Sequence, residues 1–240
     1  MKKLITSLVF ALALTFACIC EYDVQWASDG QPINANHAAT RQAQSSHMVS
    51  LPGGITCSGT AVAEHAILTA DHCNYGDESL QMKLDRSTRV YNILGAVHDG
   101  RDHVIYILDG PKFTVVDPLL QRPPVIGEKV YIYGFGMHRY PAVRKEGVVV
   151  DEYDPSEIDR GQAMVYTSIQ VIPGDSGSAV YAQDGTVLGL VTWSTGAEGI
   201  LLDKHGNANF SLGFTPAQLD NIRSVKFKEK HDSAKLPGVV

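Results

Sequence analysis

Short apolar runs separated by turn residues dominate the pattern of hydrophobic and polar positions along this chain. Dipeptides such as Asp99-Gly100, Asp109-Gly110 and Asp184-Gly185 mark turns between them. Many short strands separated by such turns predict an all-β protein, built as a sandwich or a barrel. The runs are rich in Val, Ile, Thr and Tyr, and they cover Ala66–Thr69, Val90–Leu94, Val104–Leu108, Val130–Tyr133, Gly147–Val150, Met164–Ile169, Ala179–Tyr181, Val187–Thr192 and Phe210–Phe214.

One helix is predicted after the last strand. Thr215, Pro216 and Gln218 form a capping box with proline at the first helical position. Three apolar residues then follow at steps of three, which places them on one helix face: Leu219, Ile222 and Val225. The alternative is an exposed, fraying turn. We expect a helix that docks on the β body, followed by a loose tail over residues 226–240.

The N-terminal residues resemble a secretory signal. Met1-Lys2-Lys3 precedes an apolar stretch from Leu4 to Phe16, and the small residue Ala17 follows. Two alternatives are a short buried helix and a lipid anchor on Cys18, although Thr15 stands where such anchors usually have leucine. We expect residues 1–20 to be a signal peptide cleaved at or shortly after Ala17. The mature protein is then secreted or periplasmic.

Composition narrows the class of partner. The 240 residues include 20 Lys+Arg against 26 Asp+Glu, a formal charge of −6, with 44% hydrophobic and 19% charged residues. This composition is too apolar for a disordered chain, and a net negative charge gives no indication of the basic surface that binds nucleic acid. No apolar run reaches the roughly 20 residues that span a bilayer. We therefore expect no nucleic-acid partner and no stable membrane span.

The cysteines predict one disulfide. Cys18 and Cys20 lie beside the expected cleavage point, which leaves Cys57 and Cys73 as a pair 16 residues apart. Disulfides persist outside the cytosol, and a loop of this length contributes about 3 kcal/mol in the chain-entropy view. Two lone cysteines lack the further ligands of a zinc site, so we expect neither a metal nor a cofactor.

Three segments carry candidate chemistry. His72 precedes Cys73 at the end of an apolar run, Asp102 stands at the head of another, and Ser176 lies within Gly174-Asp175-Ser176-Gly177. Each alone fits an ordinary structural role. Together they supply a nucleophile, a base that takes its proton and a carboxylate that orients the base, in a known chain order.

With these residues in place, the chain resembles the trypsin-like (chymotrypsin-family) serine endopeptidases over roughly Ile33 to Val225. The resemblance implies one protease domain over residues 21–225, made of two six-stranded antiparallel β-barrels and a C-terminal α-helix. Its motifs are Met48–Leu51 before the first half-cystine, Leu68–Cys73 around the histidine, Tyr133–Gly136 early in the second lobe, Gly174–Gly177 around the serine and Gly189–Ser194 along the cleft.

The resemblance also implies roles. His72 is the general base and then the general acid, Asp102 orients it, and Ser176 forms an acyl-enzyme. The backbone amides of Gly174 and Ser176 form the oxyanion hole. Polypeptides are the implied substrates and protein inhibitors the implied partners. The rival hypotheses are an inactive homologue that acts as a binding protein and an esterase of another fold. The esterase is disfavoured because Ser178 breaks the Gly-x-Ser-x-Gly elbow.

Two departures concern the catalytic region. Asp71 stands where the family has a small residue, so it either raises the pKa of His72 or faces solvent. In many relatives a terminal ammonium released by cleavage pairs with the aspartate before the serine, which is Asp175 here. Residues Pro32–Ala38 resemble that terminus only faintly, and no Arg or Lys directly precedes them. This pattern indicates that Asp175 is satisfied within the chain, without zymogen cleavage.

Specificity is predicted from four positions. The resemblance implies that Gln170 falls at the floor of the specificity pocket and that Thr192, Trp193 and Ser194 fall on the cleft wall. The alternative for Trp193 is an ordinary core aromatic. A buried guanidinium needs a carboxylate, so a neutral floor argues against cleavage after Arg or Lys. We expect a neutral or small side chain at the cleavage site.

Overall fold

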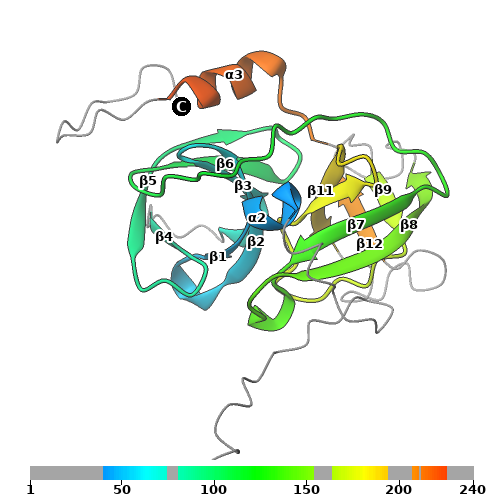
Figure 1. Ribbon diagram of the computed structural model, residues 1–240, viewed down its shortest axis with the longest axis horizontal. Coiled ribbons are helices and arrows are strands. Elements are labelled where there is room, and N and C mark those ends of the chain that lie inside the picture. The colour runs from blue at the N-terminus through cyan, green and yellow to red at the C-terminus, as the bar shows by residue number, and fades with distance from the viewer. Residues whose placement is uncertain (1–39, 75–80, 154–163, 194–206, 211, 226–240) are drawn as a thin grey trace, which may run out of the picture.

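The computed structural model describes residues 40–74, 81–153, 164–193, 207–210 and 212–225. The predictions for the signal peptide over residues 1–20, the segment Pro32–Ala38, Ser194 and the tail over residues 226–240 fall outside this part of the chain. Described strands form two closed six-stranded antiparallel barrels, which lie side by side with the chain passing from one to the other between β6 and β7 (Figure 1).

The first barrel has the strand order β1-β2-β3-β6-β5-β4. Strand β3 is buried along its whole length and pairs with β2 on one side and β6 on the other. It therefore holds the residues that follow it in a fixed position. The strands are β1 (Ser46–Ser50), β2 (Thr56–Ala63), β3 (Ala66–Ala70), β4 (Gln81–Leu84), β5 (Val90–His98) and β6 (His103–Leu108).

The second barrel has the order β10-β11-β12-β9-β8-β7. Long pairing between β7 and β8 forms one side, and β11 joins β10 to β12 on the other. The architecture predicted from the resemblance is confirmed. The strands are β7 (Lys129–Gly134), β8 (Val143–Tyr153), β9 (Met164–Thr167), β10 (Ala179–Ala182), β11 (Val187–Trp193) and β12 (Asn207–Phe210).

In the described part of the chain, two α-helices flank the barrels. Helix α2 (Arg41–Ser45) is capped by Thr40 and leads into β1. Helix α3 (Pro216–Ser224) begins with the predicted capping box of Thr215 and Gln218 and packs against the first barrel (Figure 1). Its buried residues are Leu219 and Ile222, which confirms the predicted helix, but Val225 lies one residue beyond it as the extended C-cap. Neither described helix has the length and apolar character needed to cross a bilayer.

The strand predicted over Phe210–Phe214 is wrong over residues 212–214, while Ser211 lies outside the described residues. Strand β12 ends at Phe210, and Leu212 and Phe214 are buried without strand pairing. The Gly213 amide donates to the Asp99 carboxylate (2.7 Å), 114 residues away along the chain, rather than to a neighbouring strand. Alternating apolar side chains thus fill the core here while the backbone leads towards α3.

Candidate active site

A short helical turn at the end of β3 carries His72. The turn η2 (Asp71–Cys73) follows Ala70 directly, and Cys73 forms the predicted disulfide with Cys57 on β2. Both cysteines are buried, whereas 28% of the His72 side chain is exposed. The disulfide and the buried strand therefore anchor a histidine that remains accessible.

Asp102 holds His72 through two contacts. Its Oδ2 lies 2.7 Å from His72 Nδ1, and its Oδ1 accepts the His72 backbone amide at 2.8 Å. An ionised carboxylate only accepts hydrogen bonds, so Nδ1 carries the proton and Nε2 is left as the basic nitrogen. The two contacts together fix both the tautomer and the plane of the ring.

The turn before β6 is built around a buried aspartate that sequence reasoning missed. Asp99 Oδ2 contacts His103 Nδ1 (2.6 Å) and accepts the Gly213 amide, while Oδ1 accepts the Arg101 amide (2.8 Å). Burial alone would raise the pKa of Asp99, but these hydrogen bonds bring the pKa below its ordinary value. This cluster supports Asp102, which adopts a left-handed backbone conformation (φ +66°).

The second carboxylate near the histidine points elsewhere. Asp71 Oδ2 lies 3.2 Å from His98 Nδ1, and 41% of the Asp71 side chain is exposed. Of the two alternatives left by the sequence, the geometry fits a solvent-facing Asp71. Asp102, by contrast, contacts both the ring and the backbone amide of His72.

Ser176 lies in a tight loop between β9 and β10. The Asp175 amide donates to the Ile172 carbonyl (3.0 Å), which closes a turn with Gly174 in a left-handed conformation (φ +101°). The Pro173 carbonyl accepts the Met137 amide (2.8 Å). Because the carbonyl and N–H of one planar trans peptide point in opposite directions, the Gly174 N–H points away from Met137.

The serine loop meets the histidine loop where the two barrels touch. The Ser58 amide donates to the Ser176 carbonyl (2.7 Å), and Gly177 fits so closely that a Cβ there would lie 3.0 Å from the Ala70 amide nitrogen. Ala70 directly precedes the turn that carries His72. Among the described residues, no hydrogen bond joins Ser176 to His72; such contacts are often long before substrate binds.

Ser58 was also missed from the sequence, and it joins the barrels. Its hydroxyl donates to the Gly174 carbonyl (2.8 Å) and accepts the Phe135 amide (3.0 Å), and the residue is fully buried. Its position directly after Cys57 is the signal that could have found it, because the disulfide places it beside the site.

The Asp175 carboxylate is satisfied within the chain. Oδ1 accepts a hydrogen bond from the Gly136 amide (2.9 Å), and Oδ2 accepts one from the Ile172 amide (2.9 Å). Oδ2 also forms an ion pair with Lys145 Nζ. Gly134 and Gly136 leave the space for this carboxylate, since a Cβ on either would overlap it. The internal pairing expected for Asp175 therefore has an identified partner, Lys145.

The predicted specificity positions differ in exposure. The Gln170 side chain is exposed, whereas Thr192 is buried on β11. Trp193 ends β11, and Ser194 lies beyond the described residues. Within the described part of the chain, no three His, Cys, Asp or Glu side chains gather as metal ligands would.

Two closed barrels with a histidine, an aspartate and a serine at their junction define the chymotrypsin-type fold of serine proteases. The sequence pattern of the trypsin-like peptidase domain matches residues 57–190, more than half of the chain, and the chain belongs to that family.

Solved structures agree at the level of the fold. The protease Rv3671c from M. tuberculosis is 16% identical in its active form (77% of this chain, 83% of that chain, TM-score 0.60) and 15% identical in an inactive form (75% and 90%, TM-score 0.57). The serine endoprotease from Yersinia pestis is 20% identical (80% and 68%, TM-score 0.54). No curated protein sequence matches the chain.

Proposed function

We propose that this chain is an exported serine endopeptidase that hydrolyses peptide bonds through an acyl-enzyme on Ser176. The observation that carries the proposal is the pairing of His72 with Asp102, in which one carboxylate accepts both the ring Nδ1–H (2.7 Å) and the backbone amide (2.8 Å) of the histidine. This pairing leaves Nε2 as the basic nitrogen and fixes the direction in which it points.

The first half of the reaction forms the acyl-enzyme. His72 Nε2 takes the proton of the Ser176 hydroxyl as its oxygen attacks the peptide carbonyl carbon, and the Asp102 carboxylate stabilises the imidazolium. The tetrahedral oxyanion accepts hydrogen bonds from the Gly174 and Ser176 amides. The imidazolium then gives its proton to the leaving amine as the peptide bond breaks. Water repeats these steps on the ester and frees Ser176.

The free amides of the serine loop support the oxyanion role. Among the described residues, neither the Gly174 nor the Ser176 amide donates a hydrogen bond within the protein. Loss of one such donor typically costs about 10²–10³ in rate. The engaged Pro173 carbonyl keeps this peptide in the productive orientation, so the loop is preorganised.

Export and specificity complete the proposal. The basic and apolar N-terminal pattern and the Cys57–Cys73 disulfide support export to an oxidising compartment. Gln170, Thr192, Trp193 and Ser194 would line the cleft, and the uncharged Gln170 favours neutral or small side chains at the cleavage site.

A peptide-library digest tests the proposal. Wild-type protein and Ser176→Ala are incubated with the same library, and the products are identified by mass spectrometry. We expect cleavage after neutral or small residues by the wild type alone, and fluorophosphonate labelling only where Ser176 is present. Cleavage that survives the substitution excludes Ser176 as the nucleophile. Folded wild type that neither cleaves nor reacts would identify a binding protein instead.

A further inference from the structure

The aspartate next to the nucleophile is a charge buried in the second barrel. Asp175 is 0% exposed and lies one residue before Ser176. A buried carboxylate that lacks a charged partner is strongly destabilised, because its desolvation is not compensated. Whatever supplies that partner therefore decides whether the serine loop keeps its conformation.

Lys145 on β8 supplies the partner. Its side chain is 8% exposed and its Nζ forms an ion pair with Asp175 Oδ2. Arg144, the neighbouring cation on the same strand, makes different contacts. Its guanidinium lies over the Tyr131 ring, 4.4 Å from the centroid, and pairs with Glu146. The ammonium at Asp175 thus comes from one lysine held in a strand, 30 residues before it.

The ion pair is coupled to the oxyanion hole by backbone hydrogen bonds. The Asp175 carboxylate also accepts the Ile172 and Gly136 amides, so it fastens both the serine loop and the turn η3 (Gly136–His138). The middle residue of that turn, Met137, donates to the Pro173 carbonyl and thereby orients the Gly174 N–H. Without the ammonium, turning towards water would lower the free energy of the carboxylate, and the serine loop would move with it.

We propose that Lys145 is a positioning residue that locks the Ser176 loop in its reactive conformation, so that the chain is active without cleavage near Ile33. This inference rests on the proposed peptidase function. It assigns to a side chain the role that a terminal ammonium released by cleavage performs in many trypsin-like relatives. It also explains why the chain has no basic residue directly before Pro32–Ala38.

The test compares Lys145→Met with Lys145→Arg and with Arg144→Met, a matched loss of a buried cation from the same strand. Folding is checked by thermal melting, and the rate of fluorophosphonate labelling and the kcat and KM for a cleaved peptide are measured. We expect Lys145→Met to lower kcat and the labelling rate about 10²–10³-fold with little change in KM, since oxyanion donors are displaced. Arg144→Met should stay within a few fold of wild type, and Lys145→Arg should recover most of the labelling rate.

Several outcomes overturn the inference. A folded Lys145→Met that labels within a few fold of wild type shows that the ammonium is not needed, and Lys145→Arg labelling no faster than Lys145→Met shows that charge is not the cause. The intact mass of labelled wild type gives a measurement independent of variant folding: the reacting species should retain residues before Pro32. Labelling confined to chains that begin within Pro32–Ala38 refutes the proposal. Wild type that never labels refutes the peptidase function itself.

Discussion

At the scale of single residues, two carboxylates near one imidazole have different roles. Asp102 is held in a partly buried turn and contacts both the ring and the backbone of His72. Asp71 is adjacent in sequence but is exposed and pairs with His98. Proximity along the chain therefore does not identify the orienting group; the direction of the carboxylate does.

This difference predicts unequal effects of the same substitution. Asp102→Asn should lower kcat about 10⁴-fold, because an amide can donate to Nδ1 and so favour the wrong tautomer. Asp71→Asn, the matched control, should stay within a few fold of wild type. Steady-state kinetics on a peptide that the wild type cleaves, with thermal melting to confirm folding, decides the matter. Similar losses in the two variants would contradict the assignment of Asp102.

The sequence predicts some of these residues better than others for a physical reason. His72 and Ser176 lie in local motifs whose glycines and cysteine are read directly from neighbouring positions. Asp99 does not, because its hydrogen bond to Gly213 joins residues 114 apart and exists only in the folded chain. Lys145 was missed likewise, since nothing local distinguishes a buried strand lysine from an exposed one.

At the scale of elements, the serine loop depends on close contact with the first barrel. Gly177 adopts a left-handed conformation (φ +86°) and lies against the Ser58 carbonyl, the Thr69 hydroxyl and the Ala70 amide. A Cβ would overlap backbone atoms of β2, which pairing on both sides prevents from moving. The close approach of the serine loop to β2 and β3 therefore depends on the absence of a side chain at residue 177.

Substitution of this glycine separates contact from backbone strain. Gly177→Ala should lower the free energy of unfolding by about 3 kcal/mol or more, because overpacking adds to the cost of a left-handed alanine. Gly53→Ala is the control: its φ is +83°, but a Cβ there meets nothing within 4 Å, so about 1 kcal/mol is expected. Urea denaturation measures both values. Equal losses would show that strain alone accounts for the effect.

Strand prediction succeeded where the apolar runs were continuous and failed where pairing partners decide. Strands β3, β6 and β7 are runs of buried residues and were predicted nearly to their ends. Strand β4 was missed because it is short and only alternate residues are buried. Its strand character comes from pairing with β1 and β5, which the sequence does not display.

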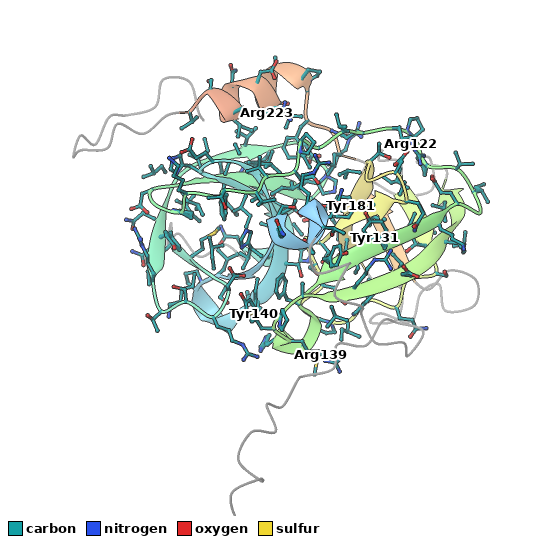
Figure 2. All side chains as sticks on the ribbon, in the orientation of Figure 1. Arg122, Tyr131, Arg139, Tyr140, Tyr181 and Arg223 are labelled. Carbon is teal, nitrogen blue, oxygen red and sulfur yellow. A yellow bond between two sulfur atoms is a disulfide. The ribbon has the colours of Figure 1, made fainter. Side chains whose placement is uncertain are left out.

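At the scale of the whole molecule, one buried cluster is shared by the two barrels and contains a layer of tyrosines, while the second barrel also has a separate cluster of its own. Tyr131 on β7 and Tyr181 on β10, both labelled in Figure 2, stack with their ring centroids 5.4 Å apart. Both belong to a buried cluster that also contains Leu68 and Ile105 of the first barrel. Since the site lies at this junction, the relative position of His72 and Ser176 depends on the cohesion of the shared core.

This tyrosine layer predicts instability at alkaline pH. Burial raises the pKa of Tyr131 to about 12 and the pKa of Tyr181 in the same direction, whereas an unfolded tyrosine ionises near its ordinary value of about 10. Between these values the unfolded chain loses protons that the folded chain retains, so the free energy of unfolding falls as pH rises from about 10 to about 12. For Tyr131 alone the full fall is on the order of 2–3 kcal/mol.

Urea denaturation of wild type and Tyr131→Phe at intervals from pH 7 to 11 measures this effect. Phenylalanine keeps the stacked ring and removes the ionisable hydroxyl, so the variant should lose less stability above pH 10 while both proteins respond alike between pH 7 and 9. Parallel curves above pH 10 would exclude Tyr131 as a source of the alkaline response. If activity declines together with the free energy of unfolding, the shared core is what keeps the histidine and serine loops in register; a decline in activity at unchanged stability would place the sensitive group within the site instead.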